Sequence, residues 1–296
     1  MTTVRMFTVD AFTNECFLGN PAAVCLDTES QPIPDDTKQK MAAEMNLSET
    51  AFVRPLRAEE HLDTGNRFNL RWFTPLTEVK MCGHATLATA FIIFDRLKNP
   101  SPEITFETLS GELIVRRDGD FLEMDFPTGT IQPENTADHQ SLLKALLGNS
   151  DAVEEVVLCE ALKYLLVRLK DGWTREEFEH WSPPVGSLPE ADKTGKMILV
   201  IVTVKGPPEK GFVDKDGTPY DFVSRSFAPW TGVPEDPVTG SAHTVLSQYW
   251  SQHLDKNDFY ARQCSRRGGD VWVMRQGERT VLRGQAVSML EAQFHL

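Results

Sequence analysis

The chain has 296 residues, 41% of them hydrophobic and 25% charged, and this ordinary globular composition excludes a wholly disordered protein. Lys and Arg number 30 against 43 Asp and Glu, so the net charge of −13 argues against nucleic acid or an anionic membrane surface as the partner. Apolar runs fall far short of the roughly 18 residues of a membrane helix, and five scattered cysteines disfavour a disulfide framework. We therefore expect a reduced, cytoplasmic protein that binds neither nucleic acid nor membranes.

The first half of the chain predicts strands that lead into a buried helix. A helix is expected over residues 36–45 and a strand over 50–53. An aromatic strand ends at Phe73-Thr-Pro75, because proline cannot continue a central strand. Gly83 then turns the chain into a helix over 85–94, which is apolar nearly all round and so should be buried on every side. Three hairpin-like strands follow over 104–107, 112–117 and 121–125.

The second half repeats this order. A strand ends at Phe227-Ala-Pro229, and Gly240 opens a helix. The apolar stripe of that helix, at helical spacing, consists of Ala242, Val245, Leu246, Tyr249 and Trp250. Strands are expected over 260–263, 270–275 and 280–284. The nine residues from Gly269 share four identities with the nine from Gly111, so three features recur in the same order and indicate a duplication.

The repeat predicts an α+β fold rather than a doubly wound parallel sheet. We expect two duplicated domains related by a pseudo-two-fold axis, each a mixed sheet wrapped as a barrel-like roll around its central helix. The predicted domains are 1–128 and 129–284, with 285–296 returning as a strand to complete the first. The break lies in the Pro- and Gly-containing segment 127–137, and the loop-rich segment 173–196 is interpreted as an insertion.

The two helix starts are candidate anion sites. Gly83-His84 and Gly240-Ser241 each stand where free backbone N–H groups and the helix dipole favour a negative charge. Two such starts could hold one substrate carboxylate. The alternative is that the glycines only make turns and that Ser241 is an ordinary N-cap.

Three further polar residues could carry chemistry. Glu49 stands at a loop–strand junction, where burial would raise its pKa and suit it to general acid–base work, although most loop glutamates are simply solvated. His84 at a helix start should be neutral and hydrogen-bonded. Asp236 precedes a proline and could equally be a turn residue.

Cys82 is a candidate nucleophile, because a helix start favours the thiolate. A small buried apolar residue is the alternative interpretation. Its partner in the repeat is Thr239, so a symmetric two-thiol mechanism lacks one thiol. The histidines do not show H-E-x-x-H spacing, and neither a Walker A loop nor G-x-G-x-x-G occurs, so we expect no metal and no nucleotide cofactor.

Several segments together resemble one family. They are Val-Asp-Ala-Phe at 9–12, Gly-Asn-Pro-Ala-Ala-Val at 19–24, 44–50, 71–75, Cys-Gly-His-Ala-Thr at 82–86 and 235–243. In this order, and nearly end to end, they resemble the phenazine-biosynthesis (PhzF-type) isomerases. The resemblance implies the diaminopimelate epimerase-like fold, in which two similar domains each wrap mixed strands around a central helix.

The resemblance also implies roles for individual residues. Glu49 matches the family's proton-shuttling glutamate, which works without a cofactor, and His84, Asp236 and Ser241 match polar residues around the substrate. Gly83, Gly240 and the N–H of Ser241 match the carboxylate-binding helix starts. Asn20, in Gly-Asn-Pro, stands where related epimerases place a substrate contact. Thr239 departs from the true epimerases, which carry a second thiol, and this argues against two-base racemisation.

We therefore predict a cofactor-independent isomerase that shuttles a proton between carbons of a small carboxylate bound in the cleft between the domains, in a chain that forms a homodimer. One rival is a single-thiol racemase or hydrolase that uses Cys82. The other is a catalytically silent protein-interaction module that has kept the fold. The candidate cleft residues are all retained, which favours chemistry.

Overall fold

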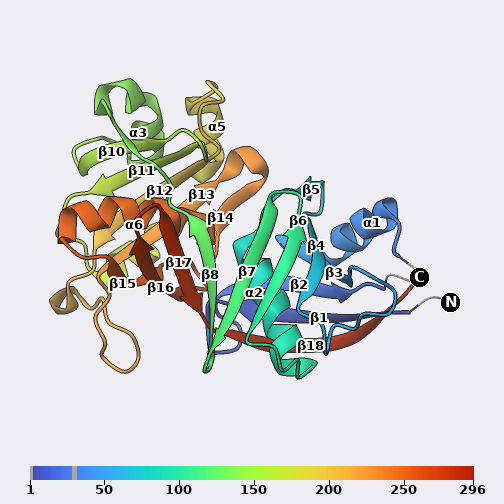
Figure 1. Ribbon diagram of the computed structural model, residues 1–296. Helices are drawn as coiled ribbons and strands as arrows, with labels where there is room; N and C mark the ends of the chain where they lie inside the picture. The colour runs from blue at the N-terminus through green and yellow to red at the C-terminus, as the bar shows by residue number, and fades with distance from the viewer. Residues whose placement is uncertain (1–2, 29–31) are drawn as a thin grey trace. The chain divides into compact units, whose positions relative to one another are not determined.

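The computed structural model describes residues 3–28 and 32–296 (Figure 1). The chain divides into two units. Unit 1 ends at Phe126 and is completed by Leu282–Leu296, whereas unit 2 is the continuous segment Pro127–Val281. The boundaries predicted from the sequence, 128/129 and 284/285, lie within three residues of these.

Unit 1 is a mixed sheet with two helices. Its elements are β1 (Thr3–Ala11), β2 (Asn20–Leu26), α1 (Asp35–Met45), β3 (Glu49–Pro55), β4 (Arg67–Phe73), β5 (Glu78–Val79), α2 (Gly83–Phe91), a π-helical turn (Ile92–Arg96), β6 (Glu103–Thr108), β7 (Gly111–Asp118), β8 (Phe121–Pro127) and β18 (Ala286–His295). The strands pair in the order β18, β1, β2, β3, β4, β6, β7, β8, with β5 added to β4. Only β2–β3 and β4–β6 are parallel among these pairs.

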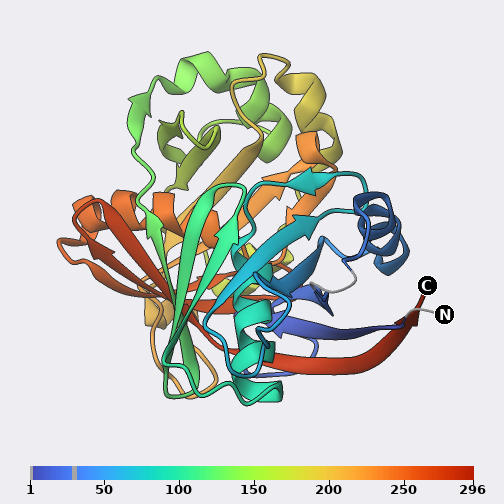
Figure 2. The ribbon, with the colours of Figure 1, turned by 45° about the vertical axis from the view of Figure 1, so that its right-hand side comes forward.

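Helix α2 forms the centre of unit 1. Each residue from His84 to Ala90 is buried, as expected for a helix that is apolar nearly all round. In Figures 1 and 2 the teal helix α2 lies among the strands of this unit, and β1 and β18 run side by side. Gly284 allows this close packing, because a Cβ there would stand 2.6 Å from Phe12 Cδ1 and 3.2 Å from Leu87 Cδ1.

Unit 2 is also built from mixed strands and has more helical segments. Its elements are β9 (Gln132–Glu134), a 3₁₀ turn (Thr136–His139), α3 (Gln140–Leu147), β10 (Val153–Cys159), β11 (Tyr164–Leu169), α4 (Arg175–His180), a 3₁₀ turn (Val185–Ser187), α5 (Leu188–Ala191), β12 (Leu199–Lys205), a 3₁₀ turn (Pro208–Lys210), β13 (Phe222–Ala228), a 3₁₀ turn (Pro229–Thr231), β14 (Val233–Asp236), α6 (Gly240–Leu254), β15 (Asp258–Gln263) and β16 (Gly269–Gln276). The chain passes from unit 2 to unit 1 within β17 (Arg279–Gly284). The strands pair in the order β9, β10, β11, β12, β13, β15, β16, with β14 added to β13. The predicted apolar stripe of α6 is buried.

The two units share one pairing order. In unit 1 the connections β1–β2, β2–β3, β3–β4, β4–β5, β4–β6 and β6–β7 are antiparallel, parallel, antiparallel, antiparallel, parallel and antiparallel. The connections β10–β11, β11–β12, β12–β13, β13–β14, β13–β15 and β15–β16 follow the same sequence. This shared order is the pattern that the predicted duplication would produce. The predicted α+β class, with mixed strands around a central helix, is confirmed.

The inserted segment 173–196 is more ordered than its loop-rich composition predicts. It contains α4, whose first turn is closed by a capping box: Thr174 Oγ1 accepts from Glu177 N–H, and Glu177 Oε2 accepts from Thr174 N–H at 2.8 Å. Phe178 of α4 is buried against the rings of Trp173 and Trp181. Six residues are too few to show helical periodicity, which explains why the sequence pattern missed this helix.

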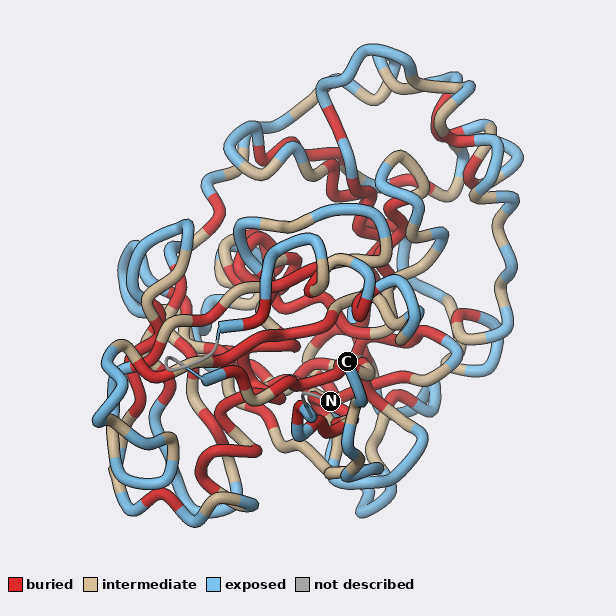
Figure 3. Tube along the Cα trace, turned by 90° about the vertical axis from the view of Figure 1, so that its right-hand side faces the viewer, coloured by how far each residue is buried: buried red, intermediate tan, exposed pale blue. Residues whose placement is uncertain are grey.

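Burial differs between the strands and the loops. In Figure 3 the buried residues lie along strands of the interior, and the exposed residues concentrate in connecting loops. Within the described ranges, no helix is both long and apolar enough to cross a membrane.

Candidate active site

Glu49 is the first residue of β3, where the chain enters the sheet of unit 1 after α1. Helix α1 ends at Asn46 in the left-handed conformation (φ 49°), and the chain then turns into β3. Glu49 stands opposite Ala22 of the parallel neighbour β2. Its side chain is only 18% exposed, which argues against the alternative that Glu49 is a solvated loop glutamate.

His84 is the second residue of α2 and lies directly beside Glu49. The distance from His84 Nε2 to Glu49 Oε2 is 3.3 Å, and Ser48 Oγ lies 3.4 Å from the same nitrogen. On the other side of the ring, Nδ1 is 3.4 Å from Cys82 Sγ. The imidazole therefore contacts both a thiol and a carboxylate, and its side chain is 6% exposed.

Burial controls the charge of Glu49. Loss of hydration raises the pKa of this carboxyl above its ordinary value, and hydrogen bonds from Ser48 and Cys82 oppose the rise because they favour the carboxylate. A carboxyl group with a raised pKa can hold and release a proton closer to neutral pH than a solvated glutamate can.

Cys82, His84 and Glu49 form a compact triangle of titratable groups. The thiol has one hydrogen, which it can donate either to the Glu49 carboxylate or to His84 Nδ1. These residues also offer three metal donors, one atom from each, within 4.8 Å of one another.

Asn20 joins this group through Ser48. It is the first residue of β2 and is fully buried, and its Oδ1 accepts a hydrogen bond of 3.4 Å from Ser48 Oγ. Gly19 makes the preceding turn possible at φ +66°, since a Cβ there would stand 2.2 Å from the carbonyl oxygen of Ala11. We call Asn20, Ser48, Glu49, Cys82, Gly83 and His84 the Glu49 cluster.

The start of α2 leaves backbone donors available. Cys82 occupies the N-cap position without a side-chain capping bond, and Gly83 is the first helical residue. The carbonyl of Cys82 is already engaged by Thr86, whose Oγ1 donates to it at 2.6 Å. The first N–H groups of a helix have no partner within it, so this start can receive an anion.

In unit 2, the turn before α6 is tied to Asp236. Asp236 ends β14, and its Oδ2 accepts from Thr239 Oγ1 at 2.5 Å. Gln263, fully buried at the end of β15, accepts from Thr239 N–H at 2.9 Å through Oε1 and donates to the Asp236 carbonyl at 2.6 Å through Nε2. One amide side chain thus fixes both ends of the 236–239 turn.

Gly240 and Ser241 open α6 just after this turn. Ser241 Oγ lies 2.9 Å from the hydroxyl of Tyr164, the first residue of β11. His243 Nδ1–H donates to the carbonyl of Thr239 at 2.8 Å. Burial lowers the pKa of His243 to about 4, so this imidazole is neutral at physiological pH. We call Tyr164, Asp236, Thr239, Gly240, Ser241 and Gln263 the Asp236 cluster.

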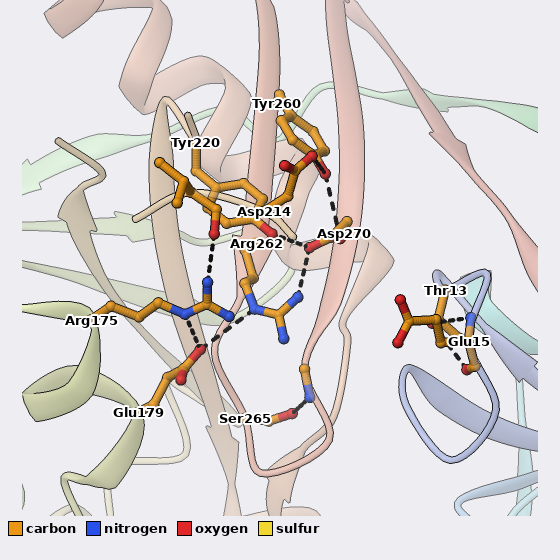
Figure 4. A network of polar contacts seen from close by, with 12 residues as sticks. Thr13, Glu15, Arg175, Glu179, Asp214, Tyr220, Tyr260, Arg262, Ser265 and Asp270 are labelled. Atoms are coloured by element: carbon orange, nitrogen blue, oxygen red, sulfur yellow. Dashed lines mark hydrogen bonds and ion pairs between the residues drawn. The ribbon is translucent and has the colours of Figure 1, made fainter. Parts of the chain in front are cut away.

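A network of paired charges surrounds Arg262, the neighbour of Gln263 in the chain (Figure 4). Arg262, next to Gln263, lies between Asp270 at 2.8 Å and Glu179 at 3.5 Å. The loop after β15 closes over Arg262, because a Cβ at Gly268 would stand 2.2 Å from Arg262 Nη2. In that loop Ser265 Oγ donates to the Pro237 carbonyl at 2.8 Å and so holds the turn that follows Asp236.

The predicted site residues therefore fall into two groups. Asn20, Glu49, Gly83 and His84 lie in unit 1, and Asp236, Gly240 and Ser241 lie in unit 2. Sequence reasoning missed the parts of Ser48, Tyr164 and Gln263. Their only sequence signal is a polar residue at a strand end, which is too common to be informative.

Comparison with known proteins gives consistent results. The model of the phenazine biosynthesis-like protein family (PhzC-PhzF) matches residues 9–292. The phenazine biosynthesis-like domain-containing protein 1 of Mus musculus is 46% identical over 287 residues, covering 97% of each chain. An uncharacterized isomerase of Halalkalibacterium halodurans is 39% identical over the full length of both chains. A crystal structure of a PhzF-family phenazine biosynthesis protein from Enterococcus faecalis superposes with a TM-score of 0.81 at 33% identity, covering 100% of both chains.

Proposed function

Because this chain belongs to the phenazine biosynthesis-like protein family, we propose that it is an isomerase that moves a proton between two carbons of one small carboxylate substrate, without a cofactor. A relative that carries the name isomerase supports the reaction class. The observation that carries the proposal is the buried Glu49 carboxyl with its raised pKa, held 3.3 Å from the imidazole of His84.

Glu49 takes the proton from one carbon and returns it to another. A general base works best when its pKa approaches the working pH, and burial moves the Glu49 pKa in that direction. His84 orients the carboxyl through Nε2 and stabilises its ionised form.

The substrate carboxylate is bound by the helix starts. The free N–H groups at Gly83 and at Gly240–Ser241 point a positive field at an anion, and this field acts locally in spite of the net charge of −13. We propose that the Glu49 cluster and the Asp236 cluster act on one substrate, with Asp236 and Ser241 polarising and orienting it.

A second candidate activity rests on Cys82. Its sulfur lies 3.4 Å from His84 Nδ1, which is the arrangement of a thiol beside its base. In this alternative the thiol, rather than Glu49, removes the proton in a one-thiol racemase. The position matching Cys82 in unit 2 is Thr239, so such an enzyme would lack a second thiol.

Proton exchange in deuterated water tests both candidates. A panel of small unsaturated and hydroxylated acids is incubated with the protein, and uptake of deuterium into carbon positions is followed by mass spectrometry. Glu49→Gln keeps the size of the side chain but cannot accept the proton, so exchange should fall by roughly 10²–10⁴. Cys82→Ala should lose less than about ten-fold.

The controls separate the roles. Glu44→Gln changes an exposed acid of α1 and should leave exchange unaltered. Asp236→Asn and Ser241→Ala should each slow exchange of the same acid if both clusters act on one substrate. Exchange that persists in Glu49→Gln and vanishes in Cys82→Ala would assign the chemistry to the thiol. Absence of exchange with every acid would favour the interaction-module alternative.

A further inference from the structure

The hydroxyl of Tyr164 is the side-chain partner of Ser241 in unit 2. Tyr164 opens β11, Ser241 is the second residue of α6, and their oxygens are 2.9 Å apart. Both residues are half-buried. The proposed function uses Ser241 but gives no role to Tyr164.

Strand registers show which residue of unit 1 corresponds to Tyr164. The Phe-x-Pro segments align Phe73 with Phe227, and these pair with Thr50 and Val200 respectively. Glu49 of β3 therefore corresponds to Leu199 of β12. Glu49 pairs with Ala22 on the neighbouring strand, and Leu199 pairs with Tyr164. Tyr164 thus brings a phenol to the place where unit 1 has only a methyl group.

The two units therefore supply the second residue of their central helix with an acidic partner from different strands. In unit 1, Glu49 of β3 contacts His84. In unit 2 the corresponding position, Leu199, is buried and apolar, and the oxygen comes instead from Tyr164 of β11. The polar contact has been kept although the strand that provides it has changed.

The acidity of the two hydroxyls decides the direction of this bond. A phenol, with a reference pKa near 10, is a much stronger acid than an aliphatic alcohol and is the better donor. When Tyr164 donates to Ser241 Oγ, the hydrogen of Ser241 must point elsewhere. Ser241 then has a donor to offer to an oxygen of an anionic ligand at the start of α6.

We infer that Tyr164 is a positioning residue that donates to Ser241 and turns the serine hydroxyl toward the substrate carboxylate. This inference deepens the proposed function and rests on it for the identity of the anion. It concerns the binding of the carboxylate and not the transfer of the proton. Its failure is therefore distinguishable from the failure of the assignment to Glu49.

A thiol introduced by Ser241→Cys reports the direction of the bond. If Tyr164 donates to position 241, it stabilises the thiolate there. The pH midpoint of alkylation by iodoacetamide at residue 241, followed by peptide mass spectrometry, should then rise by about one pH unit when Tyr164→Phe is added. Tyr249→Phe, which removes a phenol hydroxyl bonded to Glu155 elsewhere in unit 2, should leave the midpoint in place.

Binding of inorganic sulfate, used as a carboxylate analogue, measures the consequence. Titration of the full chain should show sulfate affinity reduced roughly 3- to 10-fold by Tyr164→Phe and at least as much by Ser241→Ala. The double variant should bind no more weakly than Ser241→Ala alone, because Tyr164 acts through Ser241. Additive losses, an unmoved alkylation midpoint, or a parent chain that does not bind sulfate would each overturn the inference.

Discussion

The two central helices, α2 and α6, begin with the same type of backbone conformation but carry different side chains there. Helix α2 follows Cys82 with Gly83 and His84, whereas α6 follows Thr239 with Gly240 and Ser241. Both N-caps lack a side-chain capping bond. The difference teaches that the two units share the backbone of the helix start and differ in the side chains around it.

The acids of the two units also stand at non-equivalent positions. Glu49 corresponds to Leu199 by strand register, as shown above. The alignment of Phe73 with Phe227 also aligns Trp72 with Ser226. Trp72 pairs with Val79 and Ser226 pairs with Asp236, so Asp236 corresponds to Val79. Each unit thus keeps one acid where the other has an aliphatic side chain. Neither acid therefore has an acidic counterpart at the matching position of the other unit.

A third contrast concerns the carbonyl of the N-cap residue. In unit 1, Thr86 Oγ1 donates to the Cys82 carbonyl, and in unit 2, His243 Nδ1–H donates to the Thr239 carbonyl. Both donors lie four residues after the carbonyl. A hydroxyl does not titrate in the physiological range, but an imidazole does, so the two helix starts should respond differently to acid.

The largest expected effect is acid destabilisation of unit 2 through His243. Its pKa falls from 6.5 to about 4 on burial. Between these two pH values the unfolded chain therefore binds a proton at this histidine and the folded chain does not. Stability present above pH 6.5 should decline toward pH 4 by about 3 kcal/mol. His243→Thr, which copies Thr86, should remove this slope even if it lowers stability at neutral pH.

Urea unfolding at pH 7 and at pH 4.5 measures this slope. Tryptophan fluorescence is a suitable probe, because five of the six tryptophans belong to unit 2. His180→Thr alters an exposed histidine of α4 and should keep the slope of the parent. An equal slope in the parent and in His243→Thr would contradict the assignment.

An effect of opposite sign is expected in unit 1. Burial raises the pKa of Glu49, so the folded chain resists an ionisation that the unfolded chain undergoes freely as pH rises. Glu49→Gln should therefore be more stable than the parent at pH 7.5 and equally stable below the ordinary carboxyl pKa. Each pKa unit of the rise corresponds to about 1.4 kcal/mol.

Hydrogen exchange of α2 and β3, at pH 7.5 and at a pH below the ordinary carboxyl pKa, measures this change in the stability of unit 1. The bonds from Ser48 and Cys82 oppose this rise, because they favour the carboxylate. A variant less stable than the parent at pH 7.5 would show that the Glu49 carboxylate stabilises the fold.

The smallest effect is expected at Thr86. Thr86→Val keeps the shape of the side chain but leaves the Cys82 carbonyl without the 2.6 Å bond, and should cost about 1 kcal/mol. Thr89→Val removes the matching bond to Ala85, at 2.7 Å one turn later, and should cost a similar amount. Thermal unfolding compares the two, and only the Thr86 substitution should also weaken sulfate binding at the start of α2. Equal sulfate affinity in both variants would show that the hydrogen bond to the Cys82 carbonyl does not affect anion binding.

Local patterns predicted much of the fold. The strands after each central helix were expected within one or two residues of β6, β7, β8, β15, β16 and β17, because alternating residues and glycine turns bound them. The helix over 36–45 and the buried helix at 85 were also identified. Short elements such as α4 and β9 escaped, because three to six residues carry no measurable period.

The candidate site was predictable in part, for a physical reason. Glu49 and His84 stand in segments that resemble a known family, and their contact depends on where β3 and α2 begin. Tyr164 and Gln263 contribute through pairings between strands distant in sequence, and a single sequence contains no record of those pairings. Their part in the site became visible only with the sheet registers.

The pairing of β18 with β1 has a consequence for folding during synthesis. This strand pairs with β1 from Thr3–His295 to Ala11–Ala286, so strands on either side of the whole of unit 2 in the sequence are neighbours. Unit 2 is continuous and can fold as soon as its own residues have emerged from the ribosome, but unit 1 cannot pair β1 with β18 until Leu282–Leu296 has been synthesised. One edge of β1 therefore lacks its partner strand while the whole of unit 2 is being made.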